Sequence, residues 1–257
     1  MKFTSISHSP ILFSLITMLG LSSSSGSMAR LPRLSAREIS QRVSCQTTPK
    51  PATCQRIVRR HLIRDLKGCQ IDPDRVEELP QLMQHHNLDS VRVHGRSAFL
   101  GFVPAPYSYT GKISNDGTVI IKANVYFTNH KRVDQATKDS MQVKLDQAAD
   151  KWSRNNPYNF PVRFVFKLTE KRKDSDVRAR LKQNGYTRGP YFSTWTTSWG
   201  ANTIAHEMGH VMGLDDEYSN TPFRSMTYCD RSSIMCTSGT PYTYHYYLIL
   251  KRLLCKI

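Results

Sequence analysis

One stretch of the chain, His206-Glu207-Met208-Gly209-His210 followed by Gly213 and Asp216, constrains the local fold more than any other. Histidines four residues apart lie on one face of an α-helix. Gly213 stands where a residue with positive φ can end that helix and turn the chain back. The Asp216 carboxylate can then return toward the two imidazoles. The stretch predicts a helix over about 202–212, a sharp turn, and a set of donors suited to a metal ion.

The donors expected at this site suit Zn²⁺. A hydrolytic zinc site commonly takes three protein ligands and leaves one position open for water. His206 and His210 would supply two ligands and Asp216 the third, although spacing alone leaves Asp215 and Glu217 as alternatives. Glu207 is the candidate general base, because a carboxylate beside a zinc-activated water can accept its proton and pass it to a leaving amine.

The extended motif resembles the zinc signature of the metzincin metallopeptidases, in the variant with Asp as third ligand, and the longer motif designates Asp216. That family has a methionine turn beneath the metal, and Ser232-Ser233-Ile234-Met235 is similar to it. The resemblance implies a zincin-like α+β fold with a twisted mixed sheet, an early helix, an active-site helix and a C-terminal subdomain. It covers residues 118–257 and implies a zinc endopeptidase.

The chain departs from the family pattern just after the methionine turn. Some metzincins carry a tyrosine two residues after the turn methionine, where it stabilises the transition state, whereas this chain has Thr237. Tyr218, Tyr242 and Tyr244 are the candidate replacements, and the sequence does not choose among them. The segment after Met235 shows no interpretable specificity pocket, so the substrate preference stays open.

The N-terminus has the layout of a secretory signal peptide. Lys2 precedes an apolar run over 11–21, and small residues lead to a cleavage site after Ala29. The run is shorter than the roughly 20 residues that a membrane helix needs, and no later segment approaches that length. Residues 1–29 are therefore expected to be removed, and the mature protein is expected to be secreted or periplasmic without a transmembrane segment.

Six cysteines, an even number, favour disulfides in an exported protein. Proximity suggests a Cys229–Cys236 bridge and a bridge among Cys45, Cys54 and Cys69. In zymogens related to the metzincins a propeptide cysteine can occupy the open zinc position, and the segment around Cys69 faintly resembles such a switch. A structural disulfide is nevertheless the expected role of Cys69.

A change of pattern near residue 90 predicts two parts. Residues 30–90 are expected to form a helical, cysteine-containing extension or propeptide, and residues 91–257 the candidate peptidase domain. Prolines separate the expected helices of the first part, which are 36–43, 55–66 and 75–86. The second part is expected to begin with strands at 90–94 and 98–103, and Pro104 and Pro106 are expected to end the latter.

Periodicity predicts the central elements of the second part. Apolar residues alternate over 118–127 and over 162–168, which indicates half-buried strands. Apolar residues at helical spacing predict a helix over 135–154. Trp152 belongs to that apolar stripe and is therefore expected in the core rather than at a substrate site. The aromatic and Thr-rich segment 191–199 is expected to form an edge strand.

The chain is strongly basic, with a formal net charge of +16. Lysines and arginines gather in residues 56–67 and again in Lys167–Lys173. Such clusters attract anionic surfaces or acidic partners. Basic and aromatic residues do not interleave as they do in nucleic-acid-binding grooves, so no specific nucleic acid is expected.

These patterns favour an exported zinc endopeptidase that acts on a protein or peptide substrate. Two alternatives stay open: a catalytically silent, zinc-containing basic module that binds envelopes or acidic partners, and a secreted protein whose positive surface is itself the function. Glu207 argues against a silent site, because a structural zinc site has no need of a carboxylate beside the metal. The sequence does not indicate the oligomeric state or whether residues 30–90 are removed.

Overall fold

A computed structural model describes most of the chain from residue 35 onward. The described residues are 35–43, 52, 54–56, 58–59, 69, 71–99, 103–185, 193–217, 219–221, 224–226, 230–237 and 239–257. Contacts separate Met1–Pro32 from Arg33–Ile257, and all described residues belong to the second of these units. The expected signal peptide lies outside the described residues.

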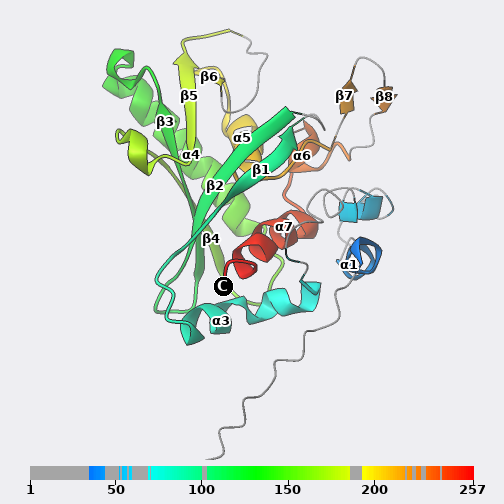
Figure 1. The fold of residues 1–257 in the computed structure, drawn as a ribbon. Helices are drawn as coiled ribbons and strands as arrows, with labels where there is room; N and C mark the ends of the chain where they lie inside the picture. The colour runs from blue at the N-terminus through cyan, green and yellow to red at the C-terminus, as the bar shows by residue number, and fades with distance from the viewer. Residues whose placement is uncertain are drawn as a thin grey trace, which may run out of the picture. The chain divides into compact units, whose positions relative to one another are not determined.

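The described chain is a mixed α+β structure built around one six-stranded sheet (Figure 1). The strands of this sheet are β1 (Val91–Phe99), β2 (Val103–Ile113), β3 (Val119–Phe127), β4 (Val162–Leu168), β5 (Val177–Lys182) and β6 (Thr194–Thr196). A separate antiparallel pair consists of β7 (Ser219–Thr221) and β8 (Arg224–Met226). The α+β class and the mixed sheet that were expected are confirmed.

Helices flank the sheet, and several of them form the connections between strands. They are α1 (Ala36–Arg42), α3 (Leu79–His85), α4 (Gln135–Arg154), α5 (Ala201–Val211), α6 (Ile234–Thr237) and α7 (Thr243–Leu254). In the described residues, three 3-10 helices accompany them: η1 (Pro73–Glu78), η2 (His130–Arg132) and η3 (Arg172–Asp174). Within the described part of the chain, no helix is long and apolar enough to cross a membrane.

Strand β3 organises the sheet because three strands pair with it. It pairs antiparallel with β2, parallel with β4 over Val119–Val125, and parallel with β5 over Val125–Phe127. Strand β1 extends the sheet beyond β2, and β6 extends it beyond β5. Strand β6 therefore lies at an edge, as predicted for 191–199, although the strand is confined to Thr194–Thr196 in the part that the structure describes.

The core lies where one face of the sheet meets helices α4, α5 and α7. The ring of Phe164 on β4 contacts Trp152 of α4 and Tyr246 of α7, with centroids 5.4 and 5.8 Å apart. Trp152 is fully buried, which confirms its predicted place in the core, and its indole Nε1 donates to the carbonyl oxygen of Ala205 in α5 at 3.0 Å. This contact fixes α4 against the helix that carries the candidate metal ligands.

Two expectations for the first strands were wrong. Segments 90–94 and 98–103 do not form two strands, because β1 is continuous from Val91 to Phe99. Strand β2 also runs through Pro104 and Pro106 instead of ending there. It pairs with β3 only from Thr110 to Ile113, so both prolines lie on a stretch with a single partner strand. A missing backbone donor is tolerated at such an edge.

The N-terminal helices follow the predictions in part. Helix α1 matches the segment predicted at 36–43, and Ser35 and Glu38 form a capping box at its start. The segment predicted as one helix over 75–86 divides into the 3-10 helix η1 and helix α3. Residues 54–56 are helical, but much of the predicted helix 55–66 lies outside the described residues.

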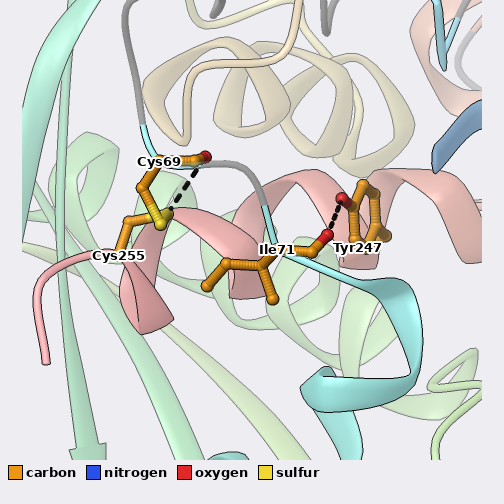
Figure 2. Close-up of a disulfide and its surroundings, with 4 residues drawn as sticks. All are labelled: Cys69, Ile71, Tyr247 and Cys255. Atoms are coloured by element: carbon orange, nitrogen blue, oxygen red, sulfur yellow. Dashed lines mark hydrogen bonds between the residues drawn. A yellow bond between two sulfur atoms is a disulfide. The ribbon is translucent and has the colours of Figure 1, made fainter. Parts of the chain in front are cut away.

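The N-terminal part is attached to α7 by a disulfide and a hydrogen bond (Figure 2). Cys69 is bonded to Cys255 with the two Cα atoms 5.5 Å apart, and the Tyr247 hydroxyl donates to the carbonyl oxygen of Ile71 at 2.8 Å. Three apolar side chains that follow are fully buried in the same core cluster as the sheet: Val76, Leu79 and Met83. Residues 71–85 thus contribute to the core that supports the C-terminal helix.

The Cys69–Cys255 bridge confirms the structural disulfide expected for Cys69 and removes this cysteine from the bridge suggested among Cys45, Cys54 and Cys69. Cys69 does not pair within the group Cys45, Cys54 and Cys69, because the end of α7 lies beside it. The cysteine switch is also wrong, since a sulfur held in a disulfide is not a thiolate that can occupy a metal position. Cys54 and Cys236 are disulfide-bonded as well. The proposed partner of Cys236, Cys229, lies outside the described residues.

Replacing both Cys69 and Cys255 by serine is expected to lower the free energy of unfolding by about 3–5 kcal/mol, because the bridge closes a loop with a sequence separation of 186 residues. Urea unfolding under non-reducing conditions measures the loss. Reduction of the wild-type protein should destabilise it at least as much as the double substitution, because a reductant also opens the bridges of Cys54 and Cys236. An unchanged unfolding midpoint in the double variant would contradict the expected role of the bridge.

Candidate metal centre

Helix α5 places His206 and His210 on one face with both imidazoles fixed by backbone carbonyl groups. It begins after Gly200 and ends at Val211, within a residue of the predicted bounds. The Nδ1 atom of His206 lies 2.7 Å from the carbonyl oxygen of Ile234, and that of His210 lies 2.8 Å from that of Leu214. Because a carbonyl oxygen only accepts, each Nδ1 carries a proton, and in the neutral ring Nε2 presents its lone pair.

Gly213 turns the chain sharply after α5, as predicted. Its φ is +90°, a conformation that favours glycine. A Cβ at this position would lie 2.7 Å from the Arg252 guanidinium and 2.9 Å from the Tyr107 ring. Arg252 also donates to the carbonyl oxygen of Met212 at 3.1 Å, which places a cation at the C-terminus of α5. The turn is therefore fixed by backbone geometry and by its close neighbours.

The turn brings Asp216 to the two imidazoles. Its Oδ1 atom lies 3.2 Å from Nε2 of His206 and 3.2 Å from Nε2 of His210. The ligand atoms of the three residues all lie within 4.8 Å of one another, and all three side chains are buried. Two imidazole nitrogens and one carboxylate oxygen are a donor set that Zn²⁺ and other divalent first-row metals accept. The three predicted ligands thus form a group that could hold a metal ion.

Glu217, the alternative third ligand, is directed elsewhere. Its Oε1 atom accepts hydrogen bonds from the Ser233 hydroxyl at 2.5 Å and from Nε2 of His245 at 3.0 Å. Its backbone N–H donates to the carbonyl oxygen of Met235 at 3.1 Å. Asp215 also stands outside the group formed by the two histidines and Asp216. Among the three adjacent acidic residues, Asp216 is the one at the centre.

Met235 packs directly against α5, in keeping with the expected methionine turn. A Cβ on Gly209 would overlap the Sδ atom of Met235, so the glycine between the two histidines permits this contact. The neighbouring residue Ile234 supplies the carbonyl group that holds His206. Met235 is fully buried and lies outside the ligand group. Its side chain packs against the helix that carries the two histidines.

The structure describes two of the three candidate tyrosines. Tyr242 and Tyr244 are both buried, and their rings contact the ring of His245, with centroids 6.0 and 4.1 Å away. Tyr218 lies outside the described residues. His245 could not be identified from the sequence as a neighbour of the centre, since it has no ligand spacing to the motif, whereas Ser233 belongs to the segment that resembles the methionine turn.

Burial and the Asp216 charge set the protonation of the metal-free centre. Burial lowers the pKa of His210, but the Asp216 carboxylate outweighs this effect and raises the pKa to about 9. Burial raises the pKa of Asp216, but the two histidines hold it well below its usual range. Burial raises the pKa of Glu207, and the histidines only partly oppose the rise. At neutral pH the metal-free centre therefore holds a proton on His210 beside an ionised Asp216.

Comparisons with known protein families, with curated proteins and with solved structures find no match to this chain. The arguments for the centre are therefore its donor set, its geometry and its burial. These support a metal site at His206, His210 and Asp216.

Binding of a divalent metal ion, with zinc as the probe, is expected to compete with the proton on Nε2 of His210. Because the pKa is raised to about 9, the proton is held below pH 9 and the competition ends above it. The apparent zinc affinity should rise roughly tenfold per pH unit between pH 7 and 9, with about one proton released per site at pH 7. Calorimetry in two buffers of different ionisation enthalpy measures both quantities. A zinc affinity that stays constant over this range would contradict the assigned protonation.

Proposed function

We propose that this protein is a zinc-dependent endopeptidase that hydrolyses peptide bonds in protein or peptide substrates. The observation that carries the proposal is the convergence of Nε2 of His206, Nε2 of His210 and a carboxylate oxygen of Asp216 in one buried group. Glu207 follows His206 on the same helix. Three protein ligands and an adjacent carboxylate are the arrangement of hydrolytic zinc sites.

The residues around the metal ligands have distinct roles in the proposed hydrolysis. A bound Zn²⁺ would supply Lewis-acid activation of a water molecule and of the peptide carbonyl. Glu207 is half-buried, and burial raises the pKa of its carboxyl in the metal-free protein. It would accept a proton from the attacking water and transfer that proton to the leaving amine. The carbonyl groups of Ile234 and Leu214 keep the two imidazoles in the tautomer that metal binding requires.

The Glu207 carboxylate favours an enzyme over a silent zinc module. A structural zinc site is closed by four ligands, whereas the described group offers three. A silent module also needs no ionisable side chain beside the metal.

A second alternative is that the basic surface alone is the function. It predicts that binding to anionic partners survives chelation of the metal and falls steeply with added salt.

We also propose that the protein is secreted or periplasmic. The layout of residues 1–29 supports this location. The Cys69–Cys255 bridge supports it independently, because stable disulfides form in oxidising compartments.

Glu207→Gln is expected to lower the rate of peptide hydrolysis by about 10²–10⁴-fold, because the amide cannot accept the proton of the attacking water. The isosteric change should leave zinc bound. The measurement compares cleavage of an unfolded protein substrate by both proteins, after the zinc content of each has been established.

Asp216→Asn serves as the companion variant, since it should lose zinc and activity together. Chelation of the wild-type protein should abolish cleavage, and added zinc should restore it. Equal rates for the wild-type protein and Glu207→Gln, both loaded with zinc, would rule out the proposed mechanism.

A further inference from the structure

A second buried polar cluster lies beside the metal ligands. It consists of Glu217, Ser233 and His245, which come from the turn after α5, from the segment before α6 and from α7. The three residues are 1%, 0% and 1% exposed. Both the Ser233 hydroxyl and the His245 ring donate to the same oxygen of Glu217. None of the three is a metal ligand, and the proposed reaction does not use them.

The hydrogen bonds of His245 define its tautomer. The backbone N–H of Tyr242 donates to Nδ1 of His245 at 2.7 Å, so Nδ1 must carry a lone pair. The proton of the neutral ring is then on Nε2, which donates to Glu217. The ring is further enclosed by Trp152, Tyr242 and Tyr244. His245 therefore presents one N–H group in a fixed direction, and Glu217 is the acceptor placed to receive it.

Glu217 is held at its backbone as well as at its side chain. Its N–H donates to the carbonyl oxygen of Met235, and its neighbour Asp216 reaches both histidines. Consecutive Cα atoms are fixed at about 3.8 Å, so a displacement of residue 217 is transmitted to residue 216. We infer that His245, together with Ser233, is a positioning residue of the metal centre, which holds Glu217 and thereby places the Asp216 carboxylate. This inference rests on the proposed metal function.

A purely structural role makes a different prediction. A buried carboxylate needs hydrogen-bond donors whether or not a metal site lies beside it, so loss of a donor would lower stability alone. A positioning role also lowers the metal affinity, because partners of this kind commonly contribute 10–100-fold to metal binding. Zinc affinity and the stability of the metal-free protein therefore separate the two roles.

The test uses the full mature chain and zinc alone as the probe. Ser233→Ala removes one donor with little change of shape, and His245→Phe removes the other. His245→Gln is the conservative variant, since its amide can still donate to Glu217. Tyr109→Phe is the matched control, because it removes a buried hydrogen bond of 2.6 Å from the Tyr109 hydroxyl to the carbonyl oxygen of Ile249. Ile249 lies on the same helix as His245, but this bond does not involve Glu217.

Ser233→Ala and His245→Phe are each expected to lower the zinc affinity about 10–100-fold in a chelator competition. His245→Gln should recover part of the loss. Tyr109→Phe should lower the urea midpoint of the metal-free protein while its zinc affinity changes by no more than about twofold. The double variant Ser233→Ala/His245→Phe should lose less affinity than the product of the single losses, because both donors act through one oxygen.

Wild-type zinc affinity in a folded Ser233→Ala protein would overturn the inference, even if His245→Phe fails to fold. So would equal affinity losses in Ser233→Ala and the Tyr109→Phe control. Those outcomes leave the proposed zinc site intact, because the wild-type protein still binds zinc. A wild-type protein that binds no zinc would remove the proposed function and the positioning role together.

Discussion

Burial of the ionisable side chains between His206 and Glu217 is the constraint on which the rest of the C-terminal half depends. A charged group without partners in a protein interior is costly, so each of these side chains must meet a donor or an acceptor. Backbone carbonyl groups accept hydrogen bonds from the two imidazoles, and the other ring nitrogens lie beside the Asp216 carboxylate. Ser233 and His245 donate hydrogen bonds to Glu217. The segment after residue 230 is therefore arranged around the polar groups of α5 and its following turn.

Close packing supports this polar arrangement from the other side. Trp152 fills the space between α4, α5 and α7, and its indole donates to a carbonyl group of α5. The absence of a side chain at Gly209 lets Met235 reach the helix. Because protein interiors are close-packed, a shift of α4 would displace α5 and its two histidines. The positions of the metal ligands are thus fixed by an apolar core whose residues are distant from them in the sequence.

A regular apolar period made most, but not all, of the elements that have one predictable from the sequence. Helix α4 and strand β4 have the predicted bounds because one face of each is apolar. Strand β5 was missed although its apolar residues alternate strictly with basic ones, because it is only six residues long and its inward residues include a small alanine. Helix α7 was missed because it is buried on almost every side and has no polar stripe to reveal a helical period.

The same distinction applies to the site. Its ligands are close in sequence on a helix and a turn, so spacing predicts His206, His210 and Asp216. His245 follows Glu217 by 28 residues, and only the tertiary fold brings the two together. No local spacing rule contains that information, because long-range pairing depends on how α7 packs.

Helix α7 joins the metal centre to the N-terminal part of the chain. Its first turn carries His245, its middle accepts the hydrogen bond of Tyr109, and Cys255 at its end is bonded to Cys69. A cut in the chain between residues 85 and 91 would leave residues 71–85 attached to α7 through this bridge and through the buried side chains of η1 and α3. Removing that segment would expose the apolar surface against which α7 packs. Loss of those contacts would also disturb the metal centre, because α7 carries both His245, which is hydrogen-bonded to Glu217, and the attachment to the N-terminal part.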